Sequence, residues 1–138
     1  MTTIILKGRE IPLIYTVLEM KTLQEEIGPL SDLRFIITGA NKEDENDTSE
    51  YGSPKHLEAV AKMVRILGNA GLEEDGKDPD LTDKWVLRAI RPGQIVETIG
   101  ICMEAMNEGM ASEIPEKKKK GRVDVVLEEI EKKKEPES

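Results

Sequence analysis

The stretch that decides the fold is SPKHLEAVAKMVRILGNAG, residues 53–71. Ser53 can cap a helix, and Pro54 loses no hydrogen bond in a first helical turn. Apolar residues then recur at helical spacing along one face, and two more widen that face. They are Leu57, Val60, Ala61, Val64 and Leu67, with Met63 and Ile66 beside them. The stretch predicts the central helix of the fold, which Gly71 can terminate.

Two short apolar segments before this helix predict an amino-terminal β-hairpin. Residues 2–6 and 11–15 are mostly aliphatic or β-branched, and Gly8-Arg9 between them has the composition of a two-residue turn. Pro12 cannot donate a ladder hydrogen bond, so its amide position should face an open edge or a bulge.

Two further helices are predicted between the hairpin and residue 53. Thr16 and Glu19 match a capping box, and Gly28-Pro29 stops a helix whose apolar residues are Leu18, Leu23 and Ile27. Residues 30–38 fit either a helix or a short strand, and we favour the helix. Residues 41–50 carry five acidic side chains and no apolar one, which predicts a mobile surface loop.

After the central helix the sequence predicts a loop and two helices. The loop, residues 73–80, is rich in Asp, Glu and Gly, and Thr82 then caps a short helix that contains Trp85. Pro92-Gly93 breaks the chain before a longer helix over residues 94–108. The apolar residues of that helix are Ile95, Ile99, Met103, Met106 and Met110.

These elements predict a mainly α fold with an N-terminal β-hairpin, a small α+β class. We expect a globular unit over residues 1–111, followed by a Lys/Glu-rich linker and an amphipathic C-terminal tail over residues 112–138. Only four residues are aromatic, so the core must be built from aliphatic side chains and methionine. The four are Tyr15, Phe35, Tyr51 and Trp85.

Composition limits the class of partner. The formal net charge is −8 and 35% of the 138 residues are charged. Such a surface does not attract nucleic acid phosphates, so we expect no nucleic acid partner. The amino terminus does not resemble a signal peptide, and no apolar run approaches membrane-spanning length. A cytoplasmic protein that does not enter a membrane is therefore expected.

The residue types that carry catalysis or bind metals do not form a recognisable pattern. His56 is the only histidine and is expected on a helix surface, while Cys102 lies in an apolar helix and is expected to be a buried hydrophobe. One Cys and one His cannot form a structural zinc site within one chain. Calcium-loop frames that start at Asp44 or Asp78 lack the closing Glu, and no phosphate-binding glycine motif occurs. We expect no enzyme activity, no cofactor and no metal.

Two apolar stripes are candidates for binding another protein. Met103, Met106 and Met110 share a helix face, where flexible thioether side chains can adapt to several partners or simply fill the core. The tail carries a second stripe at i, i+3, i+4 and i+7 spacing, formed by Val123, Val126, Leu127 and Ile130. Whether the tail is a helix or is disordered until it binds, the stripe implies a partner, because so short a helix is marginal alone.

Four segments, taken in order, carry a resemblance to a known family. They are ILKGREIPLIYTVLEMKTLQEEIG (5–28), MVRILGNAGLEE (63–74), EAMNEGM (104–110) and DVVLEEIEKKK (124–134). With these segments the chain resembles the tail assembly chaperones of long-tailed, siphovirus-type phages and prophages of Gram-positive bacteria. The resemblance implies a small helical domain with an amino-terminal hairpin and no enzyme activity.

The resemblance also implies partners. Family members are thought to coat the tape-measure protein before tail-tube subunits polymerise around it, and they self-associate, so a homo-oligomer in the bacterial host cytoplasm is expected. Many members also have a longer form, which arises when the ribosome changes reading frame near the end of the shorter one. Lysine runs such as residues 117–120 are compatible with the A-rich, slippery codons at which such a change occurs. The hypothesis is that Met103, Met106 and Met110 form part of a groove for tape-measure helices. The tail helix would either cover this groove or join neighbouring subunits.

Two other functions are compatible with parts of the sequence. An acidic DNA mimic, or another small regulatory binding protein of a phage or prophage, would use the negative charge, although lysines interrupt any regular acidic array. A small enzyme that uses an unrecognised pair of carboxylates is the third and least favoured function. The sequence places no catalytic partner residue beside any carboxylate, so no acid/base pair can be named.

Overall fold

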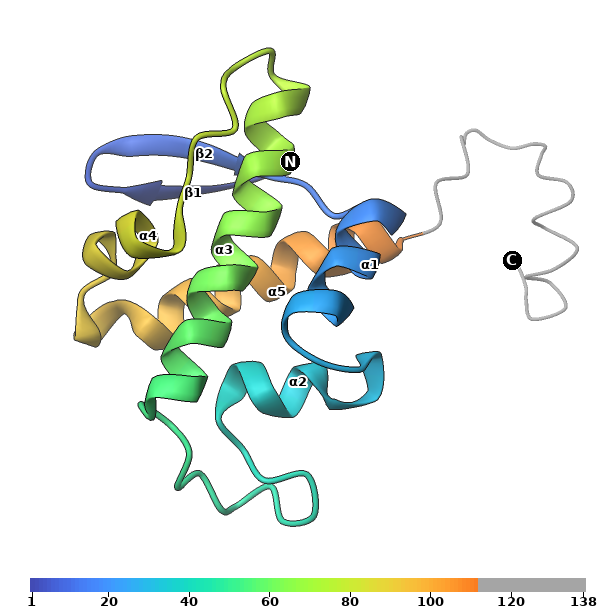
Figure 1. Ribbon diagram of the computed structural model, residues 1–138, viewed down its shortest axis with the longest axis vertical. Helices are drawn as coiled ribbons and strands as arrows, with labels where there is room; N and C mark the ends of the chain where they lie inside the picture. Colours follow the sequence, from blue (N-terminus) through green and yellow to red (C-terminus); the bar gives the residue numbers. More distant parts are fainter. Residues whose placement is uncertain (112–138) are drawn as a thin grey trace, which may run out of the picture.

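The computed structural model describes residues 1–111, and the predicted tail over 112–138 lies outside the described residues. The described part is mostly helical with an N-terminal two-stranded antiparallel hairpin, which confirms the predicted fold class (Figure 1). The elements are β1 (Thr2–Leu6), β2 (Arg9–Leu13), α1 (Val17–Glu26), α2 (Leu30–Thr38), α3 (Pro54–Glu74), α4 (Asp83–Ala89), the 3-10 turn η1 (Pro92–Gln94) and α5 (Ile95–Met110).

Helix α3 is the centre of the molecule, as the sequence predicted. The Ser53 hydroxyl accepts a hydrogen bond from the His56 backbone N–H at 3.1 Å, which caps the first turn. The hairpin and the other four α-helices all contact α3 (Figure 1). Its buried side chains include the whole predicted apolar face except Leu57, which is half-buried.

The prediction that Gly71 ends this helix is wrong, because α3 continues to Glu74. The helix instead ends in a Schellman motif, with Gly76 in the left-handed conformation at φ +75°. There the Lys77 N–H donates to the Leu72 carbonyl at 2.8 Å and the Gly76 N–H to the Glu73 carbonyl at 3.0 Å. Gly71 has a different role: a β-carbon at this position would overlap the backbone carbonyl of Pro12 in β2.

The close approach of α3 to the hairpin depends on two glycines one turn apart. A β-carbon on Gly68 would lie 2.6 Å from Leu81 Cδ1 and 3.1 Å from Ile11 Cγ2, both closer than ordinary contacts. Pro12 stands on the outer edge of β2, and this edge is closed by α3 instead of being open. The missing N–H of Pro12 therefore costs no ladder hydrogen bond.

The hairpin turn lies one residue earlier than predicted. Leu6 pairs with Arg9, so the two turn residues are Lys7 and Gly8 and not Gly8 and Arg9. Both have positive φ, +54° and +74°, as a type I′ turn requires, and this turn matches the twist of the paired strands. Alternate residues of the strands then face the core, including Ile4, Leu6, Ile11 and Leu13.

The first two helices follow the sequence signals closely. The Glu19 carboxylate accepts hydrogen bonds from the backbone N–H and the hydroxyl of Thr16, so the predicted capping interaction is present. Residues 30–38 are helical, as favoured. Leu18, expected on the apolar face of α1, is instead 62% exposed, because Leu23 is the residue of this helix that reaches the core.

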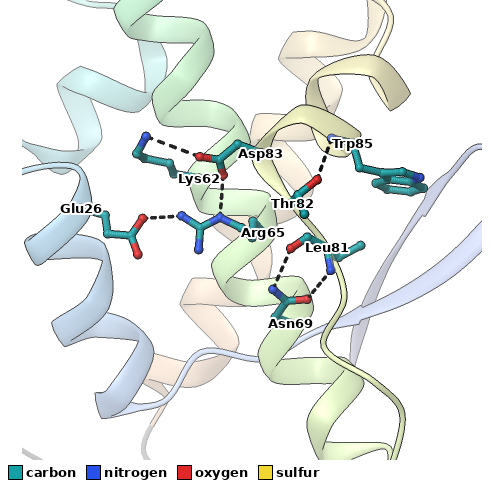
Figure 2. Close-up of polar contacts among 8 residues, drawn as sticks. All are labelled: Glu26, Lys62, Arg65, Asn69, Leu81, Thr82, Asp83 and Trp85. Carbon is teal, nitrogen blue, oxygen red and sulfur yellow. Dashed lines mark hydrogen bonds and ion pairs between the residues drawn. The ribbon is translucent and has the colours of Figure 1, made fainter.

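Polar contacts hold α4 against α3 (Figure 2). The Asn69 side chain donates to the Leu81 carbonyl at 3.2 Å and accepts from the Leu81 N–H at 2.9 Å. Thr82 caps α4 as predicted, because its hydroxyl accepts from the Trp85 N–H. Arg65 donates to Asp83 at 2.6 Å and also pairs with Glu26 of α1, so one guanidinium joins three helices.

Among residues 1–111, no helix is both long enough and apolar enough to cross a lipid bilayer.

Replacing Gly71 with alanine should lower the free energy of unfolding by about 1–3 kcal/mol, the usual cost of forcing an extra group into a packed contact. Gly100 is the matched control, because a β-carbon there meets no atom within 4 Å. Gly100→Ala should raise stability by roughly 0.5–1 kcal/mol through helix propensity. Urea denaturation of both variants measures the difference, and equal effects would contradict the close approach of α3 to β2.

Asn69→Ala should destabilise the fold by about 1–3 kcal/mol, because the backbone N–H of the buried Leu81 loses its hydrogen-bond partner. Asn107→Ala, at an exposed position on α5, is the control and should change stability little. Thermal unfolding followed by circular dichroism compares the two variants. A neutral Asn69→Ala would show that this contact does not hold the segment that leads into α4.

Candidate partner-binding surfaces

The methionine stripe of α5 runs from the core to the surface. The buried face of this helix consists of Thr98, Ile99, Cys102 and Ala105. Met103 and Met106 lie beside that face, half-buried against the core, whereas Met110 is 64% exposed. The inner part of the stripe thus contributes to the core, whereas its last methionine is exposed to solvent.

The exposed end of the stripe lies beside the start of α1. Gly109 packs so tightly on Tyr15 that a β-carbon on this glycine would overlap the Tyr15 backbone carbonyl. Figure 1 shows the end of α5 next to the first turn of α1. Val17 and Leu18 in that turn are 78% and 62% exposed. We define the methionine end as Met106, Met110, Val17 and Leu18.

The tail residues Val123, Val126, Leu127 and Ile130, also predicted to bind a partner, lie outside the described residues.

A second apolar surface lies at the opposite end of α5, and sequence reasoning missed it. A cleft of about 450 Å³ opens where the loop before α3, the first turns of α3, the end of α4 and the start of α5 meet. No charged side chain lines it, and Leu87 on its wall is 44% exposed. We define the apolar cleft by its lining, which is Tyr51, Gly52, Leu57, Val60, Leu87, Ile90, Pro92 and Ile95.

His56 supports one wall of the apolar cleft and is not the surface residue predicted. It is 2% exposed, and its Nε2 lies 2.8 Å from the Ile37 carbonyl while its Nδ1 accepts from the Gly52 N–H at 2.9 Å. These two bonds fit a neutral ring with the proton on Nε2. The prediction was wrong because α2 folds back over the start of α3, a long-range contact that local periodicity does not contain. His56 thereby fixes Gly52, next to Tyr51.

The described residues offer no arrangement for metal binding, since residues 1–111 contain no group of three or more His, Cys, Asp or Glu side chains that could hold an ion. Cys102 is fully buried, as predicted, and burial raises the pKa of its thiol to about 12. A thiol that stays protonated at neutral pH is a poor nucleophile. The described surface does carry exposed apolar side chains near both ends of α5.

Comparisons of the chain with protein-family models, curated proteins and solved structures find no match.

In the folded protein, Cys102 should not react with a thiol reagent at pH 8, whereas one thiol per chain should react in denaturant.

The free energy of unfolding should also fall as pH rises from about 9 towards 12, because the unfolded chain releases the thiol proton first. Well below pH 9 both states keep the proton, so the thiol contributes no slope there. Cys102→Ala should lack this part of the pH dependence, and rapid labelling of the native chain would contradict the burial.

Proposed function

We propose that the chain is a tail assembly chaperone of a long-tailed phage or prophage. In this function it binds the tape-measure protein without catalysis and keeps that protein soluble in the host cytoplasm until tail-tube subunits surround it. The proposal joins the four-segment resemblance to one structural observation, the methionine end. Self-association and a longer, frameshifted form belong to the same proposal.

The methionine end suits a long amphipathic helix with a repeating apolar stripe. Met110 of α5 and Val17 and Leu18 of α1 are exposed, and the end of α5 meets the chain before α1 where Gly109 packs on Tyr15. Methionine side chains are unbranched and polarisable, so they can adapt to successive, non-identical segments of one partner. A chaperone that coats a long helix needs this tolerance more than it needs high affinity per site.

Low affinity per copy is compatible with effective coating. Burial of a Leu or Met side chain contributes on the order of 1.5–3 kcal/mol, so a small patch alone binds weakly. Once several copies occupy one helix and contact each other, each later binding event is effectively intramolecular and total avidity rises steeply.

Co-expression of the chain with the tape-measure protein encoded beside it tests the proposal. The tape-measure protein should move from the pellet to the soluble fraction and should co-purify with the chain. If it is equally insoluble with and without the chain, the proposed function has no support.

The double variant Leu18→Glu with Met110→Glu should lose most of this co-purification while keeping the stability of the fold, because both side chains are largely exposed. Leu87→Glu is the matched control, since it places the same charge on an exposed leucine of the apolar cleft. It should leave co-purification unchanged. Loss of binding in the control alone would move the tape-measure contact to the apolar cleft.

A further inference from the structure

The two edges of the hairpin differ in how they are satisfied. On β2 the Pro12 carbonyl lies against α3, and the Ile14 N–H donates to the Leu67 carbonyl at 3.2 Å, so the backbone groups of these alternate residues point away from β1. Backbone groups that point into the ladder and out of it alternate along antiparallel strands. Thr3 pairs with Pro12, so the outward set on β1 is Thr3 and Ile5.

The outward backbone groups of β1 have no partner in the described part of the chain. Among residues 1–111, no backbone hydrogen bond joins Thr3 or Ile5 to another element. Both side chains are exposed. The strand TTIIL contains no charged residue, no proline and no bulge, which are devices that stop an edge strand from pairing with another chain. We define the open edge as the outward backbone groups of Thr3 and Ile5.

A hollow of about 190 Å³ lies beside the open edge, between β1 and the start of α5. Its walls are the four consecutive residues 3–6 of β1 and, on the other side, Gln94, Glu97, Thr98 and Ile101. Glu97 is the one charged residue that lines it. Glu97 is exposed and forms no ion pair within residues 1–111. The hollow thus combines apolar walls with an unpaired carboxylate.

We propose that the open edge binds an extended, basic segment of another protein by strand addition. In antiparallel pairing, Thr3 and Ile5 each exchange two backbone hydrogen bonds with the segment. The inference does not rest on the proposed function, because it concerns a surface separate from the methionine end.

The register of this pairing defines the side chains of the partner. The partner residue opposite Ile4 points to the same side of the sheet as Ile4, which is the side that packs on α5. A lysine or arginine suits this position, because its stem can lie along Ile101 and its charged end can pair with Glu97. The residues before and after it lie on the outer side beside Thr3 and Ile5, where β-branched side chains pack well.

The size of the hollow favours one side chain of a peptide over a separate small ligand. Small-molecule sites usually have volumes of about 300–1,000 Å³, and this hollow is smaller. It lies beside the open edge, so its occupant can belong to a strand that is already held by backbone hydrogen bonds.

The charges favour a basic partner over a second copy of this chain. Two copies joined edge to edge would place β1 against β1, and TTIIL offers no basic side chain to Glu97. Glu104 and Glu108, both exposed, follow seven and eleven residues after Glu97 on the same face of α5. Lys7 in the hairpin turn does not line the hollow. A partner strand with a central lysine therefore meets opposite charge, whereas a second copy does not.

Two peptides added to the full-length ¹⁵N chain test the site. The probe is acetyl-Thr-Val-Lys-Val-Thr-amide, and its matched control has glutamate in place of lysine. The amide signals of Thr3 and Ile5 should move downfield and saturate with the lysine peptide, because their N–H groups gain hydrogen bonds. The glutamate peptide should bind about fivefold more weakly or worse. Without saturable shifts at these two amides, or with equal binding of both peptides, the proposal is overturned.

Backbone methylation of the peptide separates strand addition from simple charge attraction. In the proposed register the valine N–H groups point towards β1, and the lysine backbone N–H points away. Methyl groups on both valine nitrogens should weaken binding roughly tenfold or more, because hydrogen bonds are lost and the methyl groups obstruct the edge. The matched peptide with its methyl group on the lysine backbone nitrogen should bind like the parent. Equal binding of the two methylated peptides would show that no strand is added.

Variants of the chain identify both halves of the contact. Glu97→Gln should weaken the lysine peptide about two- to fivefold, whereas Glu43→Gln, in the loop before α3, should have no effect. Ile5→Pro should abolish binding and keep the fold, because the lost N–H lies outside the ladder, as it does at Pro12. Ile5→Ala removes the same side chain but keeps the N–H, so it should still bind. Wild-type affinity in Glu97→Gln or in a folded Ile5→Pro would overturn the assignment.

Dilution of the chain without peptide tests the competing occupant. The Thr3 and Ile5 amide signals should not change with protein concentration. If they move on dilution, a second copy occupies the open edge, and the proposal of a basic partner is wrong.

Discussion

The fold depends on how closely α3 approaches the hairpin. At Gly68 and Gly71 the helix presents only backbone, so Ile11, Pro12 and Leu81 reach positions that a single β-carbon would occupy. The contact closes the outer edge of β2, which would otherwise be an unpaired edge strand. It also fixes the segment before α4. Leu81 of that segment packs on Gly68, and its backbone N–H and carbonyl are both hydrogen-bonded to the Asn69 side chain. The positions of α4 and of one wall of the apolar cleft follow from this contact.

The sequence was most informative where structure is determined locally. Helix caps at Ser53 and Thr82 and the break at Pro92-Gly93 all depend on residues within one turn of each other. The errors have a common cause in tertiary contacts. Gly71 has the composition of a helix terminator, but β2 requires it for close packing. His56 has the sequence context of a surface residue, but α2 covers it.

The candidate surfaces show the same limit. The methionines could be found from helical spacing, because they lie in one continuous helix. The apolar cleft could not be found in this way, because its lining comes from four segments whose meeting point is set by packing around α3. The two areas lie at opposite ends of α5. One small domain in this way presents apolar side chains at two separate places on its surface.

The position of α5 has a consequence for how the protein is made. Helix α5 is the last described element, yet it packs on β1, the first, and its Gly109 lies against Tyr15. At about 5–20 residues per second of translation, the hairpin emerges several seconds before its covering helix exists. During that interval the inward side of β1, with Ile4 and Leu6, has no partner from α5. The inward side of β1 is therefore exposed to aggregation until α5 has left the ribosome.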